Sequence, residues 1–372
     1  MANSRKILSN FIFTLQIFGL WPSETLQHFY PCLLCLGNWL LVIYYGHFCL
    51  KQQNNNFNLH NSLVLLMHFG NALMRTCFII FHLNGKKLDE IIDCLNDTAK
   101  QSPMKPFTLE RLHPARRNNN NSVFVSCCLL ACWFIFSFNL FIFARSFVPY
   151  NRMHPFDEKK EGIGKEILLI FTFISDSSCF CLGFLLCLLE QLAAKFQILT
   201  QWLVDAEKRY KNNVENTSGI DELLRAYLYI KICVRKLDFN IQPSVTIAIL
   251  LNFSIILFAC YEISPKYLAT KQIENGSHFF VKYLTPIYSI VIGSISLFSL
   301  IAMSTFLNSM AVLFYENIFN FRQENFLFAN NNNNGAKMML FLGSFNGKPI
   351  SLHLFGLFPL KQEFFASVSL TF

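Results

Sequence analysis

The sequence predicts an all-α fold, a polytopic transmembrane helical bundle with six complete spans, a partial seventh span and a cytoplasmic N-terminus. The 372 residues are 53% hydrophobic but only 15% charged, whereas soluble domains carry about a quarter charged residues. The apolar residues form blocks of about 20, long enough to cross a hydrocarbon core of about 30 Å as helices. The blocks are continuously apolar and lack the alternation of a membrane β-barrel.

The first half of the chain begins with a short amphipathic or interfacial helix near residues 7–20, with no cleavage site of a signal peptide after it. Three apolar blocks follow, which predict spans at about 29–50, 59–83 and 123–143. Arg75 lies towards the inner end of the second span, so its side chain is expected to snorkel to the interface.

The second half holds three more apolar blocks, which predict spans at about 167–189, 244–262 and 284–306. The fourth span is expected to continue as an amphipathic helix to residue 211, and a separate amphipathic helix is expected at 220–240. A polar stretch is predicted from 307 to 363. Three asparagine runs are assigned to loops as low-complexity segments.

These elements divide the chain into residues 1–306, a six-span domain with long cytoplasmic helix extensions, and residues 307–372, a cytoplasmic segment leading into an incomplete seventh span. With the N-terminus inside, the inner segments hold 21 Lys and Arg residues and the outer loops hold 9. This bias favours that orientation. It also accounts for the net charge of +8 without nucleic acid as a partner. The sequon at Asn275 falls in the last outer loop, where glycosylation is expected.

Catalytic motifs are not recognisable in the sequence. It has no glycine-rich phosphate loop, no HExxH and no GxSxG, so the sequence predicts no enzymatic activity, no cofactor and no metal site. Asp176 is an acidic residue deep inside a predicted span, where a carboxylate is costly and often functional. Two interpretations stay open: a polar wall of a ligand cavity, or a structural partner for a polar side chain on a neighbouring helix.

Aromatic residues in the outer halves of the spans are the other candidates for a ligand pocket, with ordinary packing or an interfacial aromatic belt as the alternative. With Asp176, the predicted pocket residues are Trp133, Phe138, Tyr261 and Tyr288, and Phe141 and Tyr283 belong to the wider set.

The segment from Leu354 to Glu363, with Gly356, Leu357 and Phe358 within it, resembles the approach to the seventh helix in the insect gustatory receptor family of the insect chemoreceptor superfamily. The resemblance implies a taste receptor in the plasma membrane of gustatory neuron dendrites. It further implies a ligand-gated, non-selective cation channel, a homo- or hetero-tetramer with other gustatory receptors, with a small-molecule tastant and membrane lipids as partners. The inner helices at 190–211, 220–240 and 307–363 would then pack between subunits.

The family's seventh helix carries Thr-Tyr, five apolar residues and Gln-Phe, and this sequence lacks that pattern, although Thr371-Phe372 resembles its start. Residues 364–372 make about 13–14 Å of helix, less than half of a membrane span. The sequence therefore leaves open a non-conducting or degenerate receptor product. A secondary transporter is a weaker alternative, because the internal repeats typical of transporters are not evident.

Overall fold

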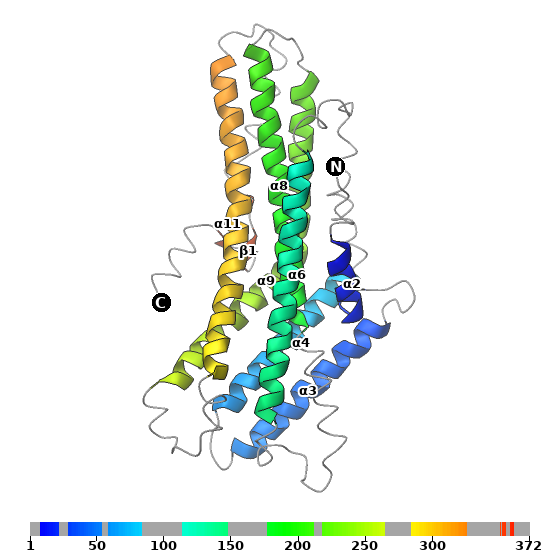
Figure 1. Cartoon of the computed structure of the whole chain (residues 1–372), viewed down its shortest axis with the longest axis vertical. Helices are drawn as coiled ribbons and strands as arrows, with labels where there is room; N and C mark the ends of the chain where they lie inside the picture. The colour runs from blue at the N-terminus through cyan, green and yellow to red at the C-terminus, as the bar shows by residue number, and fades with distance from the viewer. Residues whose placement is uncertain are drawn as a thin grey trace.

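The computed structural model describes residues 8–21, 29–53, 59–83, 114–147, 177–211, 218–264, 284–325, 350, 352–354 and 358–360. These residues form seven helices and a two-stranded hairpin (Figure 1). The helices are α2 (Ser9–Ile17), α3 (Phe29–Gln53), α4 (Leu59–Leu83), α6 (Pro114–Phe147), α8 (Ser178–Lys211), α9 (Ser218–Ile263) and α11 (Thr285–Asn325). The strands are β1 (His353–Leu354) and β2 (Phe358–Pro359). The helical bundle with apolar helices is as predicted, and the two short strands are an addition to it.

Helix α8 is the centre of the bundle. It packs against α2, α4, α6, α9 and α11, and most of its apolar segment is buried, whereas most of the apolar segment of α6 is not. The sequence explains this position, because α8 is apolar nearly all round over its first half, which is typical of a buried helix. Leu192, Ala193 and Phe196 continue the buried surface beyond the predicted end of the span.

Helix α9 is one continuous helix of 46 residues with Pro243 inside it, so the predicted division into a helix at 220–240 and a span at 244–262 is wrong. Proline removes one backbone hydrogen bond and usually ends or kinks a helix. Here, buried residues on both sides of the proline, including Leu237, Ile241 and Val245, keep the chain against its neighbours. Packing along the whole length outweighs the lost bond.

Two further boundaries differ from the prediction. Helix α11 runs on to Asn325 instead of ending at residue 306, because Ala311, Phe314 and Ile318 are buried at helical spacing. Helix α6 begins at Pro114 and includes the asparagines at 118–121, which were assigned to a loop. Proline is well suited to the first turn of a helix.

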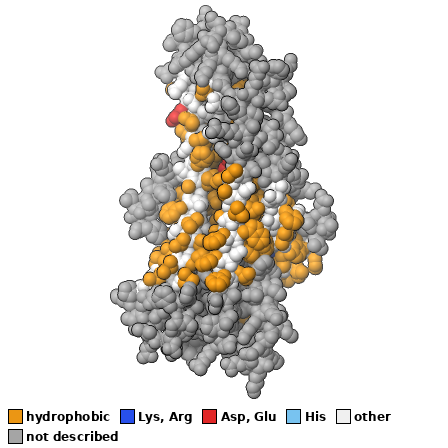
Figure 2. Space-filling view, viewed as in Figure 1, with side chains coloured by type: hydrophobic (Ala, Val, Ile, Leu, Met, Phe, Trp, Pro, Cys, Tyr) orange, Lys and Arg blue, Asp and Glu red, His pale blue; other side chains and the backbone are white. Residues whose placement is uncertain are grey.

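A belt of exposed apolar side chains lies across one face of the bundle. Figure 2 shows hydrophobic side chains gathered in a band across the middle and lower part of this face. Among the described residues, four helices are long and apolar enough to cross a membrane, and Phe29–Tyr44 and Leu65–Ile80 are shorter apolar stretches. Exposed large side chains such as Leu40 of α3, Leu130 of α6 and Ile295 of α11 fit contact with lipid rather than water.

Helices α3 and α4 cross the lower half of the bundle, and α4 packs against α9 (Figure 1). The close approach of α4 to α9 depends on Gly70, because a Cβ at this position would overlap the side chain of Leu251. Trp39 of α3 donates a hydrogen bond from Nε1 to the Thr76 hydroxyl of α4, at 2.9 Å. These contacts fix the α3–α4 pair to the rest of the fold.

The hairpin β1–β2 is antiparallel, with His353 opposite Pro359 and Leu354 opposite Phe358. It lies beside α9 and α11 in Figure 1, and strand structure was not expected here from the sequence. Ile350, Leu352, Leu354 and Leu360 are all buried in the main hydrophobic core. The segment is therefore an integral part of the packed bundle.

Candidate ligand-binding site

An aromatic stripe on α6 is the first part of the candidate site. Phe134, Phe138 and Phe141 recur at intervals of four and three residues, which places them on one face of the helix. Their rings follow one another, with centroids 6.1 Å apart for Phe134 and Phe138 and 6.2 Å apart for Phe138 and Phe141. The stripe presents a continuous aromatic surface towards the end of α6.

Tyr288, in the first turns of α11, completes this aromatic cluster. Its ring centroid lies 4.7 Å from that of Phe138, and its hydroxyl donates a hydrogen bond to the backbone carbonyl of Ile135, at 3.2 Å. Both ring and hydroxyl of Tyr288 therefore hold the start of α11 to α6. The predicted pocket residues Phe138 and Tyr288 are in direct contact.

The chemistry of the aromatic cluster, defined here as Phe134, Phe138, Phe141 and Tyr288, is apolar with one polar group. None of the four side chains carries a charge. The polar group is the Tyr288 hydroxyl, which donates a hydrogen bond to the backbone carbonyl of Ile135. Small-molecule sites typically combine an apolar aromatic wall with a few placed polar atoms. This surface suits a neutral, flat molecule better than a sugar or an ion.

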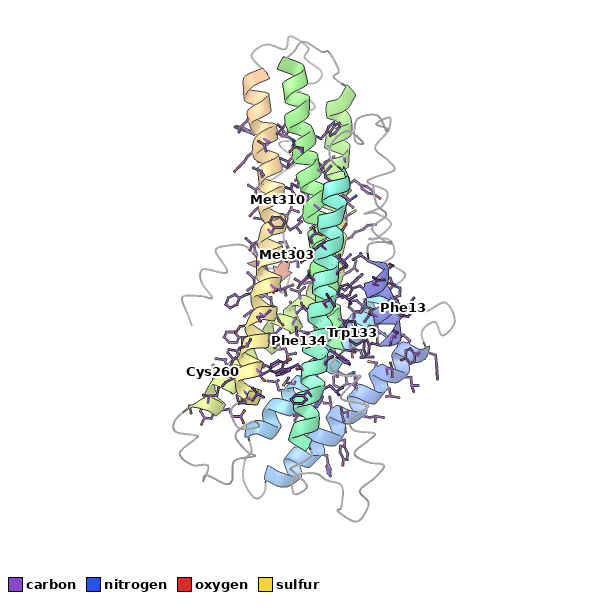
Figure 3. All side chains as sticks on the ribbon, in the orientation of Figure 1. Phe13, Trp133, Phe134, Cys260, Met303 and Met310 are labelled. Carbon is purple, nitrogen blue, oxygen red and sulfur yellow. The ribbon has the colours of Figure 1, made fainter. Side chains whose placement is uncertain are left out.

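Trp133 belongs to a different cluster, on the side of α6 that faces α2 (Figure 3). Its ring packs at 6.0 Å from Phe18, 5.7 Å from Phe136 and 5.1 Å from Phe180. These contacts join α6, α8 and the end of α2. The structure thus separates Trp133 from Phe138 and Tyr288, and gives it a packing environment at a helix junction.

The other predicted site residues are dispersed. Tyr261 lies near the end of α9 with 61% of its surface exposed. Asp176, Tyr283 and Asn275 lie outside the described residues, as do Gly356 and Leu357 of the segment that precedes the predicted seventh span. Phe358 begins strand β2. Among the residues that the structure describes, no cluster of His, Cys, Asp and Glu is arranged to hold a metal ion.

Arg75 does not snorkel, so the prediction for this residue is wrong. Its side chain is 0% exposed. One guanidinium nitrogen donates to the carbonyl oxygen of Phe18 at 2.8 Å, and the other donates to the hydroxyl of Ser177 at 2.6 Å. The planar fork of arginine allows both bonds at once. Arg75 therefore joins α4 to the end of α2 and the start of α8.

The C-terminal end of α2 has the geometry to bind the Arg75 cation. Gly19 has φ +61°, and the amides of Gly19 and Leu20 bond back to Gln16 and Leu15, which is the Schellman pattern of a helix C-terminus. This pattern leaves the Phe18 carbonyl available to Arg75. The negative end of the helix dipole favours a positive charge at this position.

Sequence reasoning missed the Arg75 contacts, because Phe18 and Ser177 lie 57 and 102 residues away along the chain. A signal was nevertheless present. A glycine after a short apolar helix predicts a C-terminal cap, and a cation inside an apolar span predicts a buried partner. The phenylalanine spacing on α6 could also have been read directly, since the interval of four then three residues is a helical stripe.

Comparison with known proteins identifies the fold. No protein-family model matches the sequence, and no curated protein matches it significantly. The insect olfactory receptor OR5 from Machilis hrabei in complex with eugenol superimposes with a TM-score of 0.72 and 14% identity, over 99% of this chain and 95% of that chain. A second structure of that receptor gives 0.74 and 12%, over 99% and 96%. The chain thus has the fold of an insect olfactory receptor over nearly its whole length.

Proposed function

We propose that this chain is an insect chemoreceptor subunit, a ligand-gated cation channel of the plasma membrane that responds to small molecules. The observation that carries the proposal is the shared fold, which extends over 99% of this chain and at least 95% of the olfactory receptor structures. The apolar belt, and the four helices among the described residues that are long and apolar enough to cross a membrane, support a multi-pass membrane location.

We assign the receptor to the gustatory branch, with taste as the sense it serves. The support is the resemblance of the segment from Leu354 to Glu363 to the gustatory receptor family. On this proposal the working unit is a homo- or hetero-tetramer with other gustatory receptors, and the dendrite of a gustatory neuron is its location. The N-terminus is then cytoplasmic, and Asn275 lies on the outer side.

The ligand is proposed to bind against the aromatic cluster, where Phe138 and Tyr288 meet. Eugenol, the molecule bound to the olfactory receptor OR5, is a neutral aromatic compound, and the uncharged surface of this cluster is suited to the same chemical class. A ligand that binds one conformation of the α6–α11 junction more tightly than another shifts the channel between states, as ligand gating requires.

Expression of the full chain in oocytes, with cation currents recorded during perfusion of eugenol and of sucrose, tests the proposal. We expect a current with eugenol. Replacing Tyr288 or Phe138 by Ala should raise the half-maximal eugenol concentration about three- to tenfold, because an aromatic pair contributes about 0.5–1.5 kcal/mol beyond area burial. Tyr288→Phe separates the role of the hydroxyl from that of the ring.

Phe306→Ala is the matched control, because Phe306 is also an aromatic residue of α11 but is 41% exposed and outside the aromatic cluster. Equal shifts for Phe306→Ala and Tyr288→Ala would contradict the assignment of the site. A chain that reaches the membrane but conducts nothing, alone or with other gustatory receptors, would instead favour a non-conducting product. Ligand uptake without current would favour a transporter.

A further inference from the structure

The hairpin segment, defined here as the described residues 350, 352–354 and 358–360, is held to α9 by one carboxylate. Asp238 accepts a hydrogen bond from the backbone amide of His353 on Oδ1, at 2.8 Å, and Oδ2 lies 2.7 Å from the imidazole Nδ1 of the same residue. An ionised carboxylate can only accept, so the proton of this second bond belongs to Nδ1. One side chain thus fixes both the backbone and the ring of His353.

A serine of α11 fastens the same segment at a second point. The Ser304 hydroxyl accepts from the amide of Leu352 at 3.2 Å and donates to the carbonyl of Leu360 at 3.3 Å. The amide of Leu360 in turn bonds to the carbonyl of Leu352 at 2.8 Å. Ser304 is 0% exposed, and it ties together the two ends of the hairpin as they meet α11.

These two contacts differ from ordinary polar side chains on the same helices. Asn240 of α9 and Ser309 of α11 are also short and polar, but each bonds to the carbonyl four residues earlier in its own helix. Asp238 and Ser304 instead reach out to backbone groups that are 115 and 48 residues away along the chain. Buried backbone groups need such partners, since leaving them unpaired is costly.

We infer that Asp238 and Ser304 are positioning residues that couple α9 and α11 to the hairpin segment, and through it to channel opening. The inference rests on the proposed function, because the segment from Leu354 to Glu363 is the one that resembles the approach to the pore helix. Movement of α11 at Tyr288, near its beginning, is carried along a continuous helix to Ser304. The two fastenings then pass that movement to the hairpin, which is packed into the same core.

The physical basis of the inference is the stiffness of the connection. A hairpin held through apolar contacts alone can slide, since apolar contacts are non-directional. Hydrogen bonds to a charged group are directional and roughly twice as strong as neutral ones. The Asp238–His353 pair and the Ser304 hydrogen bonds fix one position of the hairpin against α9 and α11. If either contact is lost, the two helices can move without moving the hairpin.

The first measurement follows hydrogen exchange in the full-length protein in lipid nanodiscs, at peptides covering residues 350–360. In Asp238→Ala and Ser304→Ala we expect exchange there to accelerate about tenfold, because the free energy lost with such a bond is on the order of 1.4 kcal/mol. Asp238→Asn keeps an acceptor for the His353 amide and should restore most of the protection. Asn240→Ala and Ser309→Ala should leave these peptides unchanged.

The second measurement separates coupling from binding, with eugenol as the probe. In Asp238→Ala and Ser304→Ala we expect eugenol binding to the purified protein within about twofold of wild type, and the maximal eugenol-evoked current reduced about tenfold. Asp238→Asn should recover much of the current. A merely structural role would lower binding, current and the amount of folded protein together.

Two results would overturn the inference. One is unchanged exchange at residues 350–360 in both alanine variants, which would show that the two side chains do not hold the hairpin. The other is faster exchange with a normal maximal current, which would show that fastening is unconnected to gating. A wild-type chain without any eugenol current refutes the proposed function alone, because the exchange experiment needs no current and still decides whether the hairpin is fastened.

Discussion

Removal of the Arg75 guanidinium should weaken the junction of α2, α4 and α8, which are far apart in sequence, and so lower the stability of the fold. Arg75→Met keeps a long apolar side chain in the same space and deletes the bonds to the Phe18 carbonyl and the Ser177 hydroxyl, at 2.8 and 2.6 Å. A hydrogen bond to a charged group contributes about 1.5–3 kcal/mol. Removing the buried charge also removes its desolvation cost, which offsets part of the loss.

The net expectation for Arg75→Met is a decrease of about 2–4 kcal/mol in the free energy of unfolding. Arg75→Lys should be at least as destabilising. Lysine keeps the charge but presents one nitrogen, which cannot occupy both positions of the guanidinium fork. Arg75→Lys, which keeps the charge, is thus predicted to lower the free energy of unfolding at least as much as Arg75→Met, which removes it.

Reversible unfolding in mixed detergent micelles with increasing dodecyl sulfate, followed by tryptophan fluorescence, measures these differences. Arg235→Met is the control, since Arg235 is exposed on α9, and it should remain within about 0.5 kcal/mol of wild type. The reasoning fails if Arg75→Met is as stable as the control variant. It also fails if Arg75→Lys matches wild type, because the fork geometry would then be irrelevant.

Three further changes test the contacts that join the helices. Gly70→Ala should lower the free energy of unfolding by about 1–3 kcal/mol, because the new methyl group overlaps Leu251. Adding Leu251→Val should restore part of the stability. If the second substitution instead adds a further loss of stability, the overlap is not the cause. Trp39→Phe removes the indole donor to Thr76 and should cost about 0.5–1.5 kcal/mol in the same assay. Tyr30→Phe removes the bond from the Tyr30 hydroxyl to the Ile17 carbonyl, at 2.7 Å; a similar cost is expected, and no change would show that water replaces the bond.

The parts of the fold that could be predicted from the sequence are those set by local composition. Apolar blocks of about 20 residues located the helices, because a membrane span must satisfy its backbone internally. The ends of the helices were less predictable. Pro243 indicated a boundary, but packing on both sides carries α9 through it. The extension of α11 to Asn325 depends on burial against partners that composition does not reveal.

The candidate site was predictable in part for the same reason. Phe138 and Tyr288 were identified as aromatic residues in the outer halves of spans, and they do meet. Trp133 satisfied the same criterion and lies in another cluster, because neighbouring residues of a helix point in different directions. The contacts of Arg75 and Asp238 could not be predicted, since their partners are backbone groups remote in sequence, and any residue type supplies a carbonyl or an amide.

The Arg75 junction has a consequence for how the protein is made. Arg75 of α4 is synthesised 102 residues before its partner Ser177. Until then, α2 is already available, and its C-terminal carbonyl at Phe18 can receive the cation. We therefore expect the end of α2 to stabilise the Arg75 charge until α8 has been synthesised and Ser177 provides the second bond. Deletion of α2 together with Phe18 should consequently reduce the yield of inserted protein more than the stability of protein that has already folded.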